Sequence, residues 1–174
     1  MKFVKKLLTL LFFSFLLSAC GTMQYQSEEY PLRAGLIQPI KMKGNVQVIN
    51  NQTSNQEMIV YSYMGTKLKS SIKEISTTFV NQTKDELKKN GQIIDHREGK
   101  SLAIKVNSLK STYTNLMFWR SSINFEVTLG NGQKIPFIVK HTSGVLIQDL
   151  NGCIAEGVMT LLNDKRVREY LAQE

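Results

Sequence analysis

Residues 123–139 read INFEVTLGNGQKIPFIV, and their pattern indicates one class of structure. Apolar and polar residues alternate on both sides of a Gly-Asn-Gly-Gln loop, as they do in paired strands that each bury one face. An Asn-Gly pair between two such runs predicts a hairpin with a type I′ turn, because that turn needs a positive φ at two successive residues. Pro136 has no backbone N–H to donate, so the second strand is expected at a sheet edge or at a bulge.

The segments before this hairpin predict further strands and one long helix. Alternating runs at 46–48 and 102–106 are typical of strands, whereas 58–63 fits a strand or the start of a helix. Between them, apolar residues from Leu68 to Leu87 recur at three- and four-residue steps or their multiples, with lysines on the other positions, which predicts an amphipathic helix of roughly twenty residues. Thr66 is its expected N-cap and Gly91 the expected residue after its end.

The end of the chain is also helical in pattern. Leu150, Ile154, Val158 and Leu161 keep helical spacing over 149–163, and Asp164 is placed to cap a second helical piece. The complete order predicts an α+β fold. We expect an antiparallel or mixed sheet, with the long helix and the C-terminal helix packed on one face.

The N-terminus has the pattern of an export signal. Lysines at 2, 5 and 6 precede an apolar run over 7–17, which is too short to span a bilayer as a helix. Leu17-Ser18-Ala19-Cys20-Gly21 then resembles the lipobox of bacterial lipoproteins. The alternative is an ordinary secretory signal in which Cys20 is incidental.

The lipobox resemblance implies cleavage between Ala19 and Cys20 and lipidation of Cys20. The expected organisation is a signal peptide over 1–19, a lipidated N-terminus and tether over 20–44, and a single periplasmic α+β domain over 45–174. No cofactor is expected beyond the covalent acyl and diacylglycerol groups on Cys20. Gly21 stands where the enterobacterial pattern uses Asp for inner-membrane retention, so the resemblance favours an outer-membrane anchor facing the periplasm.

Neither catalytic nor metal-binding residues can be assigned, and an enzyme is not expected. His96 and His141 belong to no metal or triad spacing, and both are interpreted as solvated loop residues. Cys153, on the apolar side of a predicted helix, is expected to be a buried structural thiol. The net charge is +8, and it falls to +5 without the three lysines of the expected signal peptide. For an exported chain this favours anionic phospholipid or lipopolysaccharide headgroups as neighbours and excludes nucleic acid.

The segment 113–120 has the most unusual composition, and it supplies the candidate partner contact: Tyr113, Phe118, Trp119 and Arg120. These residues can form core with an amphipathic rim, because Tyr and Trp often lie half-buried. Alternatively they form a protruding apolar tip that enters a partner or a lipid surface, with Arg120 on acidic headgroups.

The whole mature chain is similar to small Gram-negative lipoproteins of the YajG-like type. The similarity is carried by the lipobox, the Val46-x-Val48 strand, the helix ending in Lys89-Asn90-Gly91, the Gly-rich hairpin and the C-terminal Leu161-Leu162-Asn163-Asp164. The layout also resembles the lipopolysaccharide-assembly lipoprotein and the auxiliary lipoproteins of lipid-trafficking ABC transporters.

The resemblance implies a non-enzymatic accessory or assembly subunit of a membrane protein complex, bound to membrane lipid through Cys20 and to an envelope protein partner. A lipid- or glycan-binding module is the alternative, for example in lipid or lipopolysaccharide transport. An envelope hydrolase is a third hypothesis, with no motif behind it.

Overall fold

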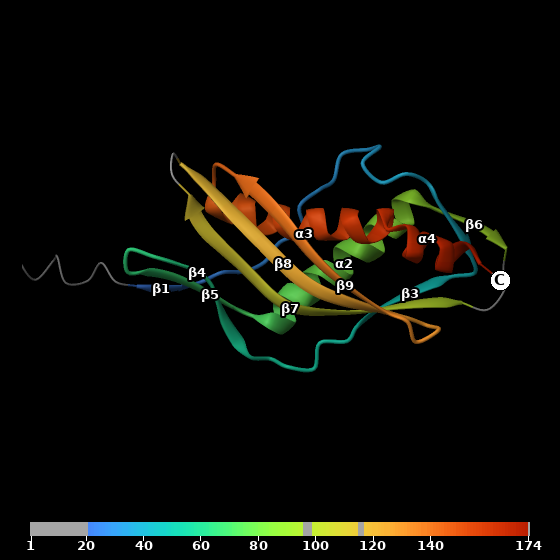
Figure 1. Cartoon of the computed structure of the whole chain (residues 1–174), viewed down its shortest axis with the longest axis horizontal. Coiled ribbons are helices and arrows are strands. Elements are labelled where there is room, and N and C mark those ends of the chain that lie inside the picture. Colours follow the sequence, from blue (N-terminus) through green and yellow to red (C-terminus); the bar gives the residue numbers. More distant parts are fainter. Residues whose placement is uncertain (1–20, 96–98, 115–116, 174) are drawn as a thin grey trace, which may run out of the picture.

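The computed structural model describes residues 21–95, 99–114 and 117–173 (Figure 1). The predicted signal peptide, Ala19 and Cys20 lie outside the described residues. Within this part of the chain, no helix combines the length and apolar character needed to cross a membrane.

The main sheet has four strands in the order β3-β7-β8-β9. Their bounds are β3 Val46–Asn50, β7 Lys100–Thr114, β8 Phe118–Leu129 and β9 Lys134–Ser143. The three long strands are antiparallel, while β3 joins β7 in parallel. This confirms the predicted α+β class, with a mixed sheet. Among the described strands β9 pairs with β8 alone, so Pro136 lies on an edge strand as predicted.

Helices cover one face of this sheet, as Figure 1 shows. They are α2 Ile72–Asn90, α3 Leu146–Asn163 and α4 Lys165–Ala172. The side chains that alternate on the covered face are buried, and Phe125 at their centre lies 4.6 Å from the ring of Phe79 on α2 and 4.9 Å from that of Phe137. A register shift between Val106 and Ser108 changes the alternation, so that Leu109 again faces the helices.

The β8–β9 hairpin forms as predicted, but its turn is not type I′. Gly132 has a φ of +86°, whereas Asn131 does not have a positive φ. The Gly132 N–H donates to the Leu129 carbonyl at 2.8 Å, and the Asn131 side chain accepts from the Gln133 N–H at 3.0 Å. One left-handed residue after an ordinary turn is therefore sufficient here.

A second sheet has the order β1-β5-β4, with bounds β1 Thr22–Gln24, β4 Glu57–Tyr63 and β5 Thr66–Ser71. The ambiguous segment 58–63 is thus a strand. The long helix begins later than predicted, at Ile72, because residues 66–71 alternate in burial and pair with β4. Ser71, not Thr66, is its N-cap and accepts from the Lys73 N–H at 3.2 Å.

The segment 21–44, predicted as a tether, is part of the domain. It contributes β1, which pairs in parallel with β5, and β2 Ile40–Lys43, which pairs in parallel with β6 Gly91–Asp95. Tyr25, Ile37 and Ile40 are buried, and the Tyr25 hydroxyl donates to the Asn151 side chain at 2.5 Å. These buried apolar residues, which stand singly in a polar sequence, hold the segment against the rest of the domain. The prediction that 21–44 is a tether is therefore wrong.

Candidate functional site

The predicted contact residues lie where β7 turns into β8. Phe118 is 51% exposed and Met117 is 75% exposed, with a left-handed φ of +67°. Trp119 is partly buried against the core, and its indole N–H has no hydrogen-bond partner among the described residues. Arg120 is exposed. Each interpretation therefore applies to part of the segment: Trp119 forms the rim of the core, while Phe118 protrudes.

The β4–β5 hairpin ends at the same place. The ring of Tyr113 lies 5.0 Å from that of Tyr63 and 5.4 Å from that of Trp119, so the two hairpin tips are in contact. Met64 and Gly65 have φ values of +44° and +82° and form the tight turn of this hairpin. Met64 at its apex is 84% exposed.

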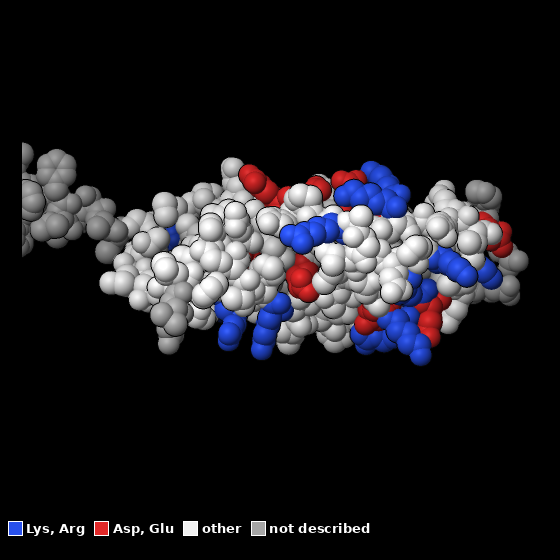
Figure 2. Space-filling view, turned by 90° about the horizontal axis from the view of Figure 1, so that it is seen from above, with Lys and Arg blue, Asp and Glu red and all other residues white. Residues whose placement is uncertain are grey.

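A third connection, from β9 into α3, completes this surface. Ser143 pairs with Trp119, and the exposed side chains of Val145 and Ile147 follow it. We call the combined surface the apolar end, made of Tyr63, Met64, Tyr113, Met117, Phe118, Val145 and Ile147. Residues 62–66, 113–118 and 143–147 contain no charged residue. On the face shown in Figure 2, the described surface toward the left is mostly white with a small blue area, and most of the charge lies over the middle and right.

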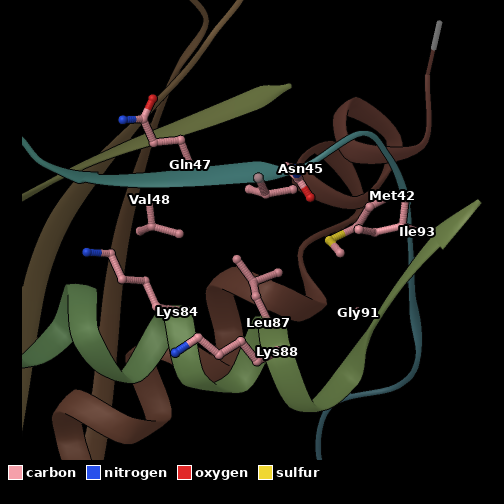
Figure 3. Close-up of a pocket in the computed structure, with 10 residues that line it drawn as sticks. Met42, Asn45, Gln47, Val48, Lys84, Leu87, Lys88, Gly91 and Ile93 are labelled. Carbon is pink, nitrogen blue, oxygen red and sulfur yellow. The ribbon is translucent and has the colours of Figure 1, made fainter. Parts of the chain in front are cut away.

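A groove lies toward the opposite end of the molecule, between β3 and the second half of α2 (Figure 3). Its volume is about 570 Å³. Val48 and Leu87 face each other across it, and Met42 and Ile93 close one end. Gly91 lies beside them without room for a side chain, because a Cβ there would clash with the backbone carbonyl oxygen of Leu87.

The polar groups of the groove are basic or neutral. Lys84 and Lys88 extend from α2 on the side below β3, and none of the described residues that line the groove is an Asp or Glu. Lys88 is held by Asp85 at 2.9 Å, whereas Lys84 has no ion-pair partner among the described residues. β3 pairs only with β7 among the described strands, so its second edge is open beside this groove. Within the part of the chain that the structure describes, the groove thus offers an apolar floor, a cation without an ion-pair partner and a strand edge without a neighbouring strand.

The groove has no signature in the sequence. The pattern shows the lysines only as polar positions of a helix, and Val46 and Val48 only as one face of a strand. Their juxtaposition depends on where β3 docks relative to α2. That placement is a tertiary property, and no local pattern in the chain encodes it.

Buried polar groups beneath the sheet form a separate cluster around Asp149. Its carboxylate accepts from the hydroxyl of Ser111 at 2.9 Å and from that of Ser121. His141 does not lie in a solvated loop as predicted: it belongs to β9, is half-buried, and its ring lies against Gly152 of α3. Both serines donate directly to the carboxylate without an intervening imidazole, which is a structural arrangement and not the order of a catalytic triad.

Cys153 and His96 are the other residues that the sequence offered as candidates for chemistry. Cys153 is fully buried, as predicted, and burial raises the pKa of its thiol to about 12. His96 lies outside the described residues. Among the residues that the structure describes, no three His, Cys, Asp or Glu side chains converge on a metal position.

Comparisons with known proteins identify structural neighbours but no family. No family model matches the chain, and no curated protein matches it significantly. Among solved structures, the chain is similar to a Xanthomonas campestris protein described under the family model DUF330, with a TM-score of 0.45 and 13% identity over 87% of this chain and 94% of that chain. A second crystal structure, of an uncharacterized protein, gives a TM-score of 0.36 and 14% identity over 83% and 99% of the two chains.

Proposed function

We propose that the protein is a lipid-anchored envelope lipoprotein of the YajG-like type, which acts without catalysis as an accessory subunit of a membrane protein complex. The lipobox at 17–21 supports the anchor on Cys20, and Gly21 supports the outer membrane facing the periplasm. The observation that carries the accessory role is the open edge of β3 beside the apolar groove.

An open strand edge beside a groove suits the addition of an extended peptide. Backbone hydrogen bonds to the edge give affinity, and side chains that alternate into the groove give specificity. Val46 and Val48 on β3 and Leu87 on α2 provide the apolar surface for such side chains. The ammonium of Lys84, which pairs with no acidic group among the described residues, favours a partner segment that carries an acidic residue.

Photo-cross-linking in intact cells tests this role. A photoreactive residue replaces Gln47, an exposed groove residue on β3, and a matched one replaces Lys140, which is exposed on the edge strand β9. We expect one discrete protein adduct from position 47 and none from position 140. The accessory role would be contradicted by equal adducts at both positions, or by none at position 47.

The same groove favours a second candidate function, a module that binds lipid or glycan. An apolar floor whose charged groups, among the described lining residues, are all lysines suits an acyl chain with an anionic head. Lys84→Glu should then weaken the binding of fluorescent lysophosphatidylglycerol, whereas Lys73→Glu, on the same helix outside the groove, should not. Headgroup attraction at an exposed lysine is screened within about 8 Å at physiological salt, so this binding should also weaken at high salt. Lipid adducts alone at position 47 would favour this function over the first.

A further inference from the structure

We infer that the apolar end lies in the lipid bilayer, in the leaflet that holds the acyl chains of Cys20. The inference rests on the proposed lipid anchor and deepens it, because it assigns an orientation to the anchored domain and a lipid partner to a surface. Three independent observations support it: the position of residue 21, the composition of the apolar end, and the charges behind it.

The chain enters the domain directly after the anchor position. The Gly21 carbonyl accepts from the Lys67 N–H at 3.1 Å, and Thr22 pairs with Lys67 in β5. Cys20 is the next residue back, and consecutive Cα atoms are about 3.8 Å apart. Lys67 is three residues from the apex at Met64, about 10 Å at the rise of a strand. The acyl chains therefore start beside the β4–β5 tip, and no spacer can hold this tip away from the bilayer.

The apolar end has the composition of a membrane-contacting surface. Met64, Met117 and Phe118 project from two hairpins that touch through the rings of Tyr63 and Tyr113. Exposed large apolar side chains in a contiguous, uncharged patch are uncommon on a protein surface that faces water. Tyr is also enriched where protein meets the membrane–water interface, because its ring is apolar and its hydroxyl is polar.

Two basic residues lie next to this surface, on the strands that lead away from the two tips, where contact with lipid headgroups is expected. Lys67 follows the β4–β5 tip on β5, and Arg120 follows the β7–β8 tip on β8. Both side chains are exposed. A basic residue at the base of an apolar tip is attracted to the phosphates of an anionic leaflet while the tip enters the acyl region.

This orientation presents the groove to the periplasm. Figure 1 shows β1 and the β4–β5 tip at one end of the long axis, and β6 with the C-terminus at the other. The groove, lined by Gly91 and Ile93 of β6, therefore lies on the part of the domain remote from the bilayer. A partner in the periplasm could reach it without displacing lipid.

Fluorescence quenching in vesicles tests the inference on the acylated full-length protein. Single cysteines replace Met64 or Phe118 at the apolar end, or Asn131 in the β8–β9 turn as a control, and each carries an environment-sensitive nitrobenzoxadiazole. Cys153 does not compete for the label, because it is fully buried. The vesicles contain phosphatidylethanolamine, phosphatidylglycerol and a lipid with a nitroxide on its acyl chain. We expect quenching at positions 64 and 118 but not at 131. We expect it to persist at high salt, because salt screens only the attraction of Lys67 and Arg120 to the headgroups and not the apolar contact or the acyl anchor.

Two variants and one mass measurement make the outcomes distinct. Phe118→Asp should abolish much of the quenching at position 64, whereas Asn131→Asp should leave it unchanged, and both positions are exposed, so the fold tolerates the changes. Mass spectrometry reports the acylation of Cys20 independently. An acylated protein without quenching at 64 and 118 would overturn the inference while the lipoprotein assignment stands. An unacylated Cys20 would overturn the anchor and the inference together.

Discussion

Gly157 of α3 lies against the ring of Phe79 on α2, where a side chain has no room. A Cβ at this position would come within 2.7 Å of one ring carbon of Phe79 and 3.4 Å of Phe125. We expect Gly157→Ala to lower the free energy of unfolding by about 1–3 kcal/mol, the usual cost of overpacking a core, measured by urea denaturation. Gly144→Ala is the control, because its Cβ would meet only the Met117 carbonyl at 3.9 Å. Equal losses for the two variants would contradict this packing role.

Cys153 makes the stability of the protein depend on pH. Burial, with a smaller contribution from Asp149, raises the pKa of its thiol from 9.0 to about 12. Between these values the unfolded chain releases the proton while the folded chain keeps it, so the free energy of unfolding falls as pH rises above 9, by at most about 1.4 kcal/mol per pH unit. Below pH 9 this contribution is fully present.

Cys153→Ala tests this dependence. The variant should show a shallower loss of stability than the parent protein between pH 9 and 10.5 in urea titrations, even though its stability is lower at every pH because of the lost packing. Burial, and after it the charge of Cys153, also raises the pKa of Tyr25, which adds a loss of the same sign in the parent protein. The part of this loss that depends on Cys153 disappears in the variant together with the titration of the thiol, so it makes the profile of the variant shallower as well. Parallel pH profiles for the two proteins would disprove the role of the thiol.

At the scale of elements, the N-cap of α2 is Ser71 in the structure, whereas the sequence pattern predicts Thr66. Ser71→Ala should cost about 1 kcal/mol, because it removes the side chain that accepts from the Lys73 N–H. Thr66→Ala replaces the cap that the periodicity predicted, and it should cost less, because Thr66 belongs to β5. Thermal unfolding of the two variants measures the difference. A larger loss for Thr66→Ala would place the helix start at 66.

The strands and helices of the core could largely be predicted, but their boundaries and turns could not. Alternation between 102 and 139 is strong because each strand buries only one face. Leu68 belongs to β5, but its four-residue step to Ile72 has the same spacing as the apolar residues of the helix. The periodicity therefore predicts one helix where the structure has a strand followed by a helix. Two successive residues with positive φ occur at Met64-Gly65 and not at Asn131-Gly132. An Asn-Gly pair does not decide the type of turn, because Gly can be the left-handed residue both in a turn with one positive φ and in a turn with two.

The candidate site was predictable only where a single segment forms it. The composition of 113–120 identified a contact surface, and part of it is exposed. Met64 and Val145 join that surface only through strand pairing and ring contacts that no local pattern contains. The groove depends in the same way on the docking of β3 beside α2.

At the scale of the whole molecule, the proposed anchor should act through its short connection to the domain. A flexible Gly-Ser spacer inserted between Gly21 and Thr22 lowers the effective concentration of the apolar end at the bilayer. We expect weaker nitroxide quenching at position 118, with unchanged acylation of Cys20 and unchanged melting temperature. The same spacer inserted in the turn at 130–133 should leave quenching unchanged. Full quenching with the spacer at residue 21 would show that the connection length is irrelevant.

The docking of the first described residues on the last helices also constrains the order in which the protein can fold. Tyr25 donates to Asn151, and the carbonyls of Gln38 and Pro39 accept from Arg168 in α4. These contacts join residues more than a hundred positions apart, so they form only once the C-terminal helices are available. If the chain is exported from its N-terminus, as the proposed lipoprotein assignment implies, residues 22–42 can complete these contacts only after the C-terminal helices have also crossed the membrane.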